Sequence, residues 1–199
     1  MAYFPMFVDL DRQPCLVAGG GNVAARKVQV LRDFGAKVTV IAPDCSEKIM
    51  DMASNDKMIE IIKRPFMEND CRGYLLVVAA TDDKALNHHI SENCKNLGIM
   101  VNAVDQKDDC SFIFSSYIKE KNLVAAFSSG GNSPALTQYL KSEEKDILTP
   151  FLGELNEFMG SIREKVLKEY DTEAERKKAF EAIINSAVKE KKLPDNGSL

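Results

Sequence analysis

Short apolar runs alternate with helical apolar stripes over about the first hundred residues. The apolar runs, at 15–18, 37–42, 58–62, 74–79 and 99–104, predict five buried strands. Stripes at 23–34, 46–53 and 83–97 predict helices between them, and glycines suited to a left-handed cap follow the first and the last. This alternation predicts an α/β fold, a Rossmann-like doubly wound parallel sheet.

The pattern changes after Asp105. The β-rich runs 111–118 and 123–127, separated by polar residues, predict a β-hairpin. A helical region follows, and its starts carry recognisable signals: Ser133-Pro134, Thr149-Pro150 and a capping box from Thr172 to Glu175. These signals predict helices over 134–147, 150–170 and 172–190, with a frayed tail over 191–199.

Composition narrows the class of protein. A net charge of −4 disfavours nucleic acid as a partner, because phosphate binding needs a basic excess. No apolar run is long enough for a membrane span and the start lacks a signal sequence, so we expect a cytoplasmic protein. The five cysteines form no C-x-x-C pair, and the only histidines, His88 and His89, are adjacent and point apart. We therefore expect reduced thiols and no dedicated His/Cys metal site.

The most specific motif is a glycine turn between the first strand and the first helix. Gly19, Gly21 and Ala24 fill the G-x-G-x-x-A positions that provide the tight turn, the approach of a pyrophosphate and close helix–strand packing. The helix that begins at Asn22 or Val23 would point free N–H groups at the phosphates. The sequence therefore predicts a dinucleotide-binding site.

Polar residues also follow the second and fourth predicted strands, at the edge of the sheet where the dinucleotide is expected. Asp44, after Pro43, is placed to accept hydrogen bonds from ribose hydroxyls. The alternative is that it is a turn residue at the start of the next helix. No arginine lies nearby to bind a 2′-phosphate, which favours NAD over NADP. Thr81 and Asp82 are candidates for cofactor contact, the alternative being that Asp82 or its neighbour Asp83 caps the following helix.

Asp105 follows the fifth strand, where the architecture changes. It is either an acid/base beside the cofactor or a solvated loop acid like Asp108 and Asp109. A second glycine-rich turn, Ser-Ser-Gly-Gly-Asn-Ser-Pro at 128–134, opens onto a helix and is either an anion seat or a flexible cap. If this turn binds an anion, the chain has two anion-binding sites, which would indicate a dinucleotide and a separate anionic substrate.

Six spaced motifs together resemble one known family. In chain order they are Phe4-Pro-Met-Phe7, the run 16–27, Ala79-Ala-Thr-Asp82, Asn102-Ala-Val-Asp105, Ser111-Phe112 and the turn 128–134. With these motifs the chain resembles the precorrin-2 dehydrogenase family, the N-terminal module of sirohaem synthase. The last sixty or so residues match mainly in helical character.

The resemblance implies NAD-dependent oxidation of precorrin-2 to sirohydrochlorin by a symmetric homodimer, and in some members insertion of ferrous iron (ferrochelatase activity). It implies that Asp105 is the acid/base and that Asn22, Val23, Pro43 and Asp44 border NAD. It also implies that the tetrapyrrole is bordered by residues of the later motifs: Asn102, Ser111, Ser128, Ser129, Gly130, Gly131 and Ser133. We expect no methylation, because the methyltransferase half of the fused enzymes is missing from this sequence.

We accordingly expect an NAD-binding domain over 1–113, a dimerisation and substrate-binding region over 114–147, and a C-terminal helical region over 148–199. The expected chemistry is hydride transfer from the macrocycle to NAD, with Asp105 as the acid/base that transfers a proton. Lys107 or Arg64 would help to bind the carboxylates of the substrate. Two other functions stay open, a non-enzymatic NAD-sensing subunit and a dehydrogenase of another carboxylated small molecule.

Overall fold

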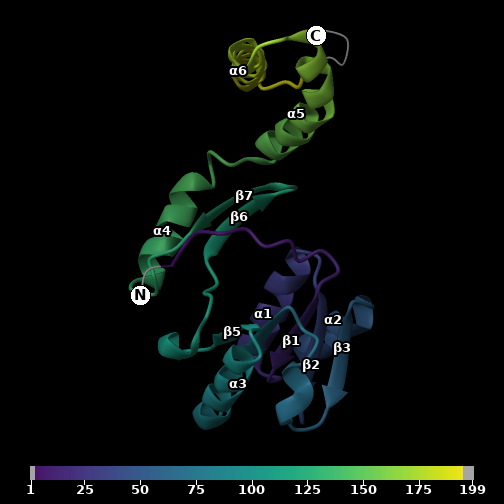
Figure 1. The fold of residues 1–199 in the computed structure, drawn as a ribbon, viewed down its shortest axis with the longest axis vertical. Helices are drawn as coiled ribbons and strands as arrows, with labels where there is room; N and C mark the ends of the chain where they lie inside the picture. Colours follow the sequence, from purple (N-terminus) through teal and green to yellow (C-terminus); the bar gives the residue numbers. More distant parts are fainter. Residues whose placement is uncertain (1–2, 195–199) are drawn as a thin grey trace. The chain divides into compact units, whose positions relative to one another are not determined.

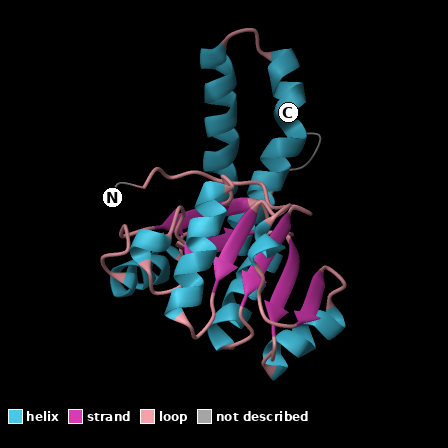
Figure 2. Cartoon of the chain, turned by 60° about the horizontal axis from the view of Figure 1, so that its bottom comes forward, coloured by secondary structure: helices cyan, strands magenta, loops and turns pink. Residues whose placement is uncertain are grey.

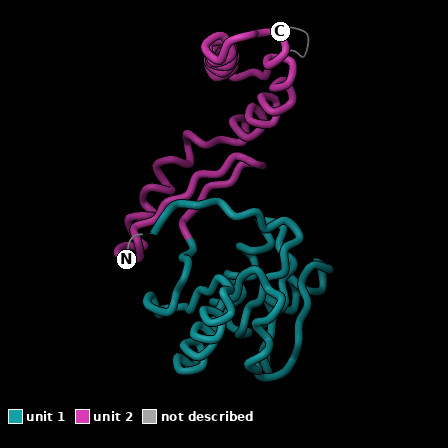
Figure 3. Tube along the Cα trace, in the orientation of Figure 1, with its two compact units in different colours: residues 1–114 teal, residues 115–199 magenta. Residues whose placement is uncertain are grey.

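The computed structural model describes residues 3–194 of the chain. It divides into two compact units, residues 1–114 and 115–199 (Figure 1 and Figure 3). The predicted fraying of 191–199 falls largely on residues 195–199, which lie outside the described range. Within residues 3–194, no helix is both long and apolar enough to cross a membrane.

A five-stranded parallel sheet forms the centre of the first unit (Figure 2). Its order is β3-β2-β1-β4-β5, and its strands are β1 (Pro14–Ala18), β2 (Lys37–Ala42), β3 (Ile59–Lys63), β4 (Leu76–Ala79) and β5 (Met100–Ala103). The helices that connect them are α1 (Asn22–Asp33), α2 (Glu47–Asn55) and α3 (Lys84–Asn96). The predicted α/β doubly wound fold is confirmed. The strand order reverses between β1 and β4, and ligands of such sheets bind beyond the carboxyl ends of the strands at this point.

Successive residues of β1 are buried in two separate cores. Cys15 and Val17 belong to the core that contains the buried residues of α1 and α2, and Leu16 and Ala18 belong to the core that contains those of α3. A strand covered on both faces needs a continuous apolar run rather than alternation, which is the pattern that residues 15–18 show. Each large apolar side chain buried in this way contributes about 1.5–3 kcal/mol.

Two connections in this unit differ from a regular strand–helix alternation. The crossover from β3 to β4 contains only the short 3-10 helix η1 (Glu68–Cys71), and β5 is followed by η2 (Lys107–Asp109). The predicted strand 111–118 is wrong in its first half, because the strand begins at Ser116. Ser111 and Phe112 instead donate their N–H groups to the Val101 carbonyl, at 2.8 and 3.4 Å, and so cover the free edge of β5.

The second unit is a hairpin followed by three helices. Its elements are β6 (Ser116–Glu120), β7 (Leu123–Phe127), α4 (Pro134–Glu144), α5 (Pro150–Glu169) and α6 (Glu173–Glu190). Ser133 caps α4 by accepting from the Leu136 N–H, and the capping box of α6 is present. Thr149 makes no side-chain cap, so the start of α5 is marked by Pro150 at its first position.

Candidate functional site

Backbone contacts on both sides hold the glycine turn after β1. Gly19 has φ +122°, and a Cβ there would collide with the carbonyl oxygen of Ala80, which follows β4. A Cβ on Gly20 would collide with the carbonyl oxygen of Asp44, which follows β2. The G-x-G-x-x-A pattern leaves position 20 unspecified, so sequence reasoning missed this requirement. The run of three consecutive glycines was the available signal.

Gly21 differs from its two neighbours because it faces open space. Nothing outside its chain neighbours lies within 4 Å of the place where its Cβ would be. Gly21 is also the N-cap of α1, and the first turn of this helix has neither a side-chain cap nor an acidic residue. The N–H groups at Asn22 and Val23 therefore begin a helix whose positive end is not neutralised, while Ala24 is fully buried against the sheet. This cradle fits a pyrophosphate.

Asp44 is exposed, as is Pro43 before it. The N-cap of α2 is Ser46, so Asp44 does not begin that helix. Ser46 also donates its N–H to the Gly20 carbonyl at 2.8 Å, which ties the start of α2 to the glycine turn. The carboxylate of Asp44 makes no hydrogen bond or ion pair within residues 3–194 and can accept from ribose hydroxyls.

Thr81, after β4, is bound into its own turn. The buried side chain of Asn87 accepts from the Thr81 N–H at 3.1 Å and lies 2.7 Å from the Thr81 hydroxyl. Asp83 caps α3 by accepting from the N–H groups of Ala85 and Leu86. Asp82 is exposed and is not the cap. Asp82 is therefore available to a ligand, whereas the side chain of Thr81 already has a structural role.

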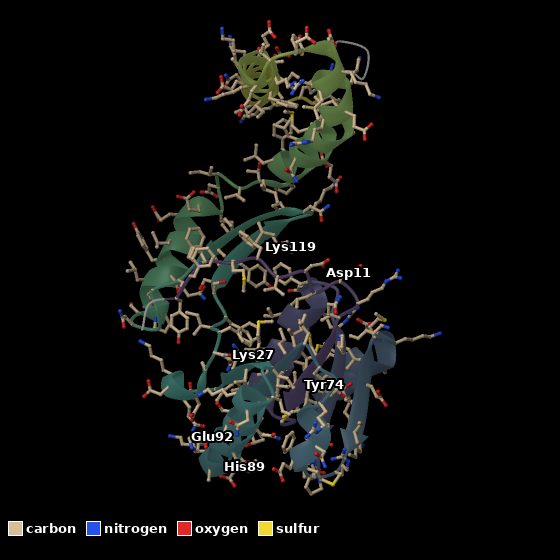
Figure 4. All side chains as sticks on the ribbon, in the orientation of Figure 1. Asp11, Lys27, Tyr74, His89, Glu92 and Lys119 are labelled. Atoms are coloured by element: carbon tan, nitrogen blue, oxygen red, sulfur yellow. The ribbon has the colours of Figure 1, made fainter. Side chains whose placement is uncertain are left out.

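Asp105 follows β5 in a left-handed backbone conformation, with φ +59°, and its side chain is exposed. Lys27 of α1, labelled in Figure 4, is half-buried with its Nζ 3.9 Å from the centre of the Phe114 ring. Burial, followed by the positive charge of Arg26, lowers the pKa of Lys27, and the negative charge of Asp105 acts in the opposite direction. Sequence reasoning did not single out Lys27 as a cation close enough to interact with Asp105, because their proximity depends on the fold.

Asn102 and Ser111 hold together the segment around Asp105. The Asn102 amide donates to the Phe112 carbonyl at 3.0 Å, and the Ser111 hydroxyl accepts from the Val101 N–H at 2.7 Å. Asn102 is 8% exposed. Both side chains thus have structural partners, and their contact with a substrate stays a prediction.

The 128–134 turn of the second unit is an array of serine hydroxyls. Ser128 accepts from the Gly130 N–H at 3.1 Å, Ser129 from the Ser133 N–H at 2.9 Å, and Ser133 from Leu136 at 3.2 Å. Gly130 and Gly131 have φ of 63° and 81°. A hydroxyl that accepts from the backbone keeps its own proton for donation, so the three serines can donate to carboxylates of a ligand.

Among the other polar side chains of the first unit, those of Arg64 and His88 have partners. Arg64 forms a two-pronged ion pair with Asp70, at 2.6 and 2.7 Å, so its guanidinium is already engaged. Lys107 is exposed. His88 Nδ1 lies 2.8 Å from Asp109 Oδ1. The five cysteines are free, and in the described part of the chain no three His, Cys, Asp or Glu side chains gather as metal ligands would.

The strand order, the switch point and the open glycine cradle define a doubly wound dinucleotide-binding protein. Residues 6–116, more than half of the chain, match the family model NAD_binding_7, which describes NAD(P)-binding proteins. The chain belongs to this NAD(P)-binding family.

Similar proteins extend the likeness to nearly the whole chain. A siroheme synthase of Nitrosospira multiformis is 38% identical over 193 residues, which are 96% of this chain and 41% of that protein. A siroheme synthase of Mannheimia succiniciproducens is 37% identical, over 93% of this chain and 39% of that protein. These relatives confirm the predicted resemblance, and the chain spans about two fifths of their length.

A solved structure supports the fold independently. SirC, a precorrin-2 dehydrogenase, superimposes with a TM-score of 0.74 over 93% of this chain and 91% of its own. The two sequences are 23% identical, so this match is evidence about the fold. The fold and the family therefore agree on a dinucleotide-binding unit at the start of the chain.

Proposed function

We propose that this chain catalyses the NAD-dependent oxidation of precorrin-2 to sirohydrochlorin in sirohaem synthesis. The observation that carries the proposal is the open cradle at Gly21, set in a chain that is similar to siroheme synthases over 93–96% of its length. Asp44 and Asp82 are exposed acceptors after β2 and β4, and with Asn22 and Val23 they would hold NAD. Asp44, together with the lack of a neighbouring arginine, favours NAD over NADP.

The reaction removes a hydride and a proton from the substrate. Bound NAD supplies the hydride acceptor. Asp105 lies after β5 at the carboxyl edge of the sheet and accepts the proton through its carboxylate. Lys27 adds a half-buried positive charge that interacts with the carboxylate of Asp105. Precorrin-2 carries several carboxylates, and the serine hydroxyls at 128, 129 and 133 would bind them.

The proposal includes a homodimer and a cytoplasmic location. The location is supported by the five free cysteines, which are typical of proteins in a reducing compartment.

Turnover of precorrin-2 by the purified chain tests the proposal. With NAD present, NADH and sirohydrochlorin should appear in equal amounts. Asp105→Asn keeps the size of the side chain but does not accept a proton at neutral pH, so the rate should fall by about 10²–10⁴ with unchanged NAD affinity. Asp108→Asn is the matched control, since Asp108 is an exposed acid of η2 three residues away, and it should turn over as the wild type does.

Each alternative gives a different result in the same assay. Binding of NAD without turnover would identify an NAD-sensing subunit. If NADH forms only with a different carboxylated compound, that compound rather than the tetrapyrrole is the substrate. If Asp105→Asn turns over at the wild-type rate, Asp105 does not accept the proton. An arm with ferrous iron and sirohydrochlorin measures whether sirohaem forms, and so decides ferrochelatase activity.

A further inference from the structure

A cavity of about 420 Å³ opens in the first unit where β1, β2 and β3 begin. Its walls include Pro14 and Lys37, the first residues of β1 and β2, and Lys57 and Met58, which precede β3. The glycine turn lies at the other end of the same strands. Strands of this length span about 17–20 Å, so the cavity is separate from the proposed dinucleotide site.

The cavity exists because one crossover lacks a full helix. Val38, Val40 and Ile59 belong to the core that contains the buried residues of α1 and α2. Thr39 and Glu60 alternate with them, so they lie on the opposite face, where they are paired across β2 and β3. In a doubly wound fold, the crossover from β3 to β4 normally covers this face with a helix. Here it contains only η1, and Thr39 and Glu60 line the cavity.

The charges around the cavity are mainly positive. Lys37, Lys57 and Arg72 line it, against the single carboxylate of Glu60. Within residues 3–194 none of the three cations is in an ion pair, and Arg72 makes one long hydrogen bond, from its Nε to the Asn69 side chain at 3.3 Å. Such a local excess of positive charge stands out in a chain with a net charge of −4.

The acids nearest in sequence do not neutralise these cations. Asp56 precedes Lys57 but binds Arg32 at 2.6 Å. Asp70 lies two residues before Arg72 but binds Arg64 at 2.6 Å. Because each of these carboxylates is held by another arginine, Lys57 and Arg72 keep their charge available to a ligand in the cavity.

The rest of the lining is suited to the carbon frame of a small molecule. Pro14, Met58 and Tyr74, the last labelled in Figure 4, supply apolar surface, and Thr39 supplies a hydroxyl. We propose that this cavity is a second ligand site, which binds a small organic anion with two or more carboxylate or phosphate groups. Its volume is within the range of ordinary small-molecule sites. This proposal is independent of the proposed activity.

Calorimetric titration of the full chain at fixed ionic strength tests the proposal, with citrate as the carboxylate probe and fructose 1,6-bisphosphate as the phosphate probe. At least one probe should bind saturably, and the tighter one identifies the preferred acid group. The triple variant Lys37→Gln, Lys57→Gln, Arg72→Gln should bind it at least about tenfold more weakly, because charge-assisted hydrogen bonds are lost. Glu60→Gln should bind it more tightly, because a like charge is removed.

A second triple variant, Lys48→Gln, Lys178→Gln, Lys189→Gln, is the control. It removes the same charge from exposed lysines outside the cavity and should bind as the wild type does. Circular dichroism checks that each variant is folded. The titration is repeated with NAD, which should not displace the probe. Absence of saturable binding up to about 10 mM, equal weakening in both triple variants, or displacement by NAD would each overturn the second site.

Discussion

Three consecutive glycines after β1 have three different physical roles. Gly19 adopts a positive φ beside Ala80, Gly20 passes against the backbone of Asp44, and Gly21 leaves room for a ligand. The first two are required by the fold, since a side chain there would collide with backbone. Only Gly21 is placed to serve binding without being needed for packing.

We therefore expect substitutions at two adjacent glycines to separate binding from folding. Gly21→Asp should abolish NAD binding, through bulk and like charge beside the pyrophosphate, while the free energy of unfolding changes little. Gly20→Ala should destabilise the fold by about 1–3 kcal/mol, because the backbone must shift to admit a methyl group. Calorimetric titration with NAD and chemical denaturation measure the two effects. If folded Gly21→Asp binds NAD with unchanged affinity, the NAD site does not lie at this turn.

At the scale of elements, the crossover from β3 to β4 is held by an ion pair rather than by a helix. Arg64 follows β3, and Asp70 lies within η1 and also accepts from the Met67 N–H at 2.7 Å. The hydrogen bonds from Arg64, more than any other interaction, hold the pKa of Asp70 below its ordinary value of 3.8. Since the folded state favours the ionised carboxylate, this pair stabilises the fold above the ordinary pKa.

Asp70→Asn should accordingly lower the melting temperature at neutral pH. The difference from the wild type should shrink as the pH falls below about 4 and through the lowered pKa of the folded state, because protonation then removes the same interaction from the wild type. Asp51→Asn, at an exposed position of α2, is the control and should melt like the wild type throughout. Thermal melts from pH 7 to pH 2 test this. A difference that stays constant over that range would contradict the linkage.

At the scale of the whole molecule, the second unit exposes an apolar face on α4. Leu136, Tyr139 and Leu140 are 51%, 57% and 39% exposed, and their spacing puts them on one side of the helix. Large exposed apolar patches are typical of interaction surfaces. The homodimer that the resemblance implies would cover this face with a second copy of the chain.

We expect a homodimer formed mainly by residues beyond 113. Sedimentation at micromolar concentration should give twice the mass of the chain. The double variant Leu136→Glu, Leu140→Glu should be a monomer, because charges buried without partners at the interface oppose association. Lys48→Glu makes the same change in net charge at an exposed position of α2, in the first unit, and should leave the dimer intact. A stable monomer of the wild-type chain would contradict this prediction.

Patterns set by local chemistry could be interpreted from the sequence alone. Continuous apolar runs predicted the parallel strands, because a strand buried on both faces excludes polar side chains. The glycine pattern predicted the cradle at Gly21, and Ser133 and Thr172 predicted helix starts, because a cap depends on the few residues beside it. The relatives confirmed the resemblance carried by the spaced motifs.

Other features depended on contacts between residues far apart in sequence. Gly20 is required only because Asp44 passes beside it, and the Thr81 side chain is engaged only because Asn87 is folded back onto it. Ser111 extends no strand because it covers the edge of β5. The cavity beside Lys37 and Arg72 likewise depends on a helix missing from one crossover. Propensity and periodicity describe neighbours along the chain, whereas packing between strands decided which polar groups have partners and which are open to a ligand.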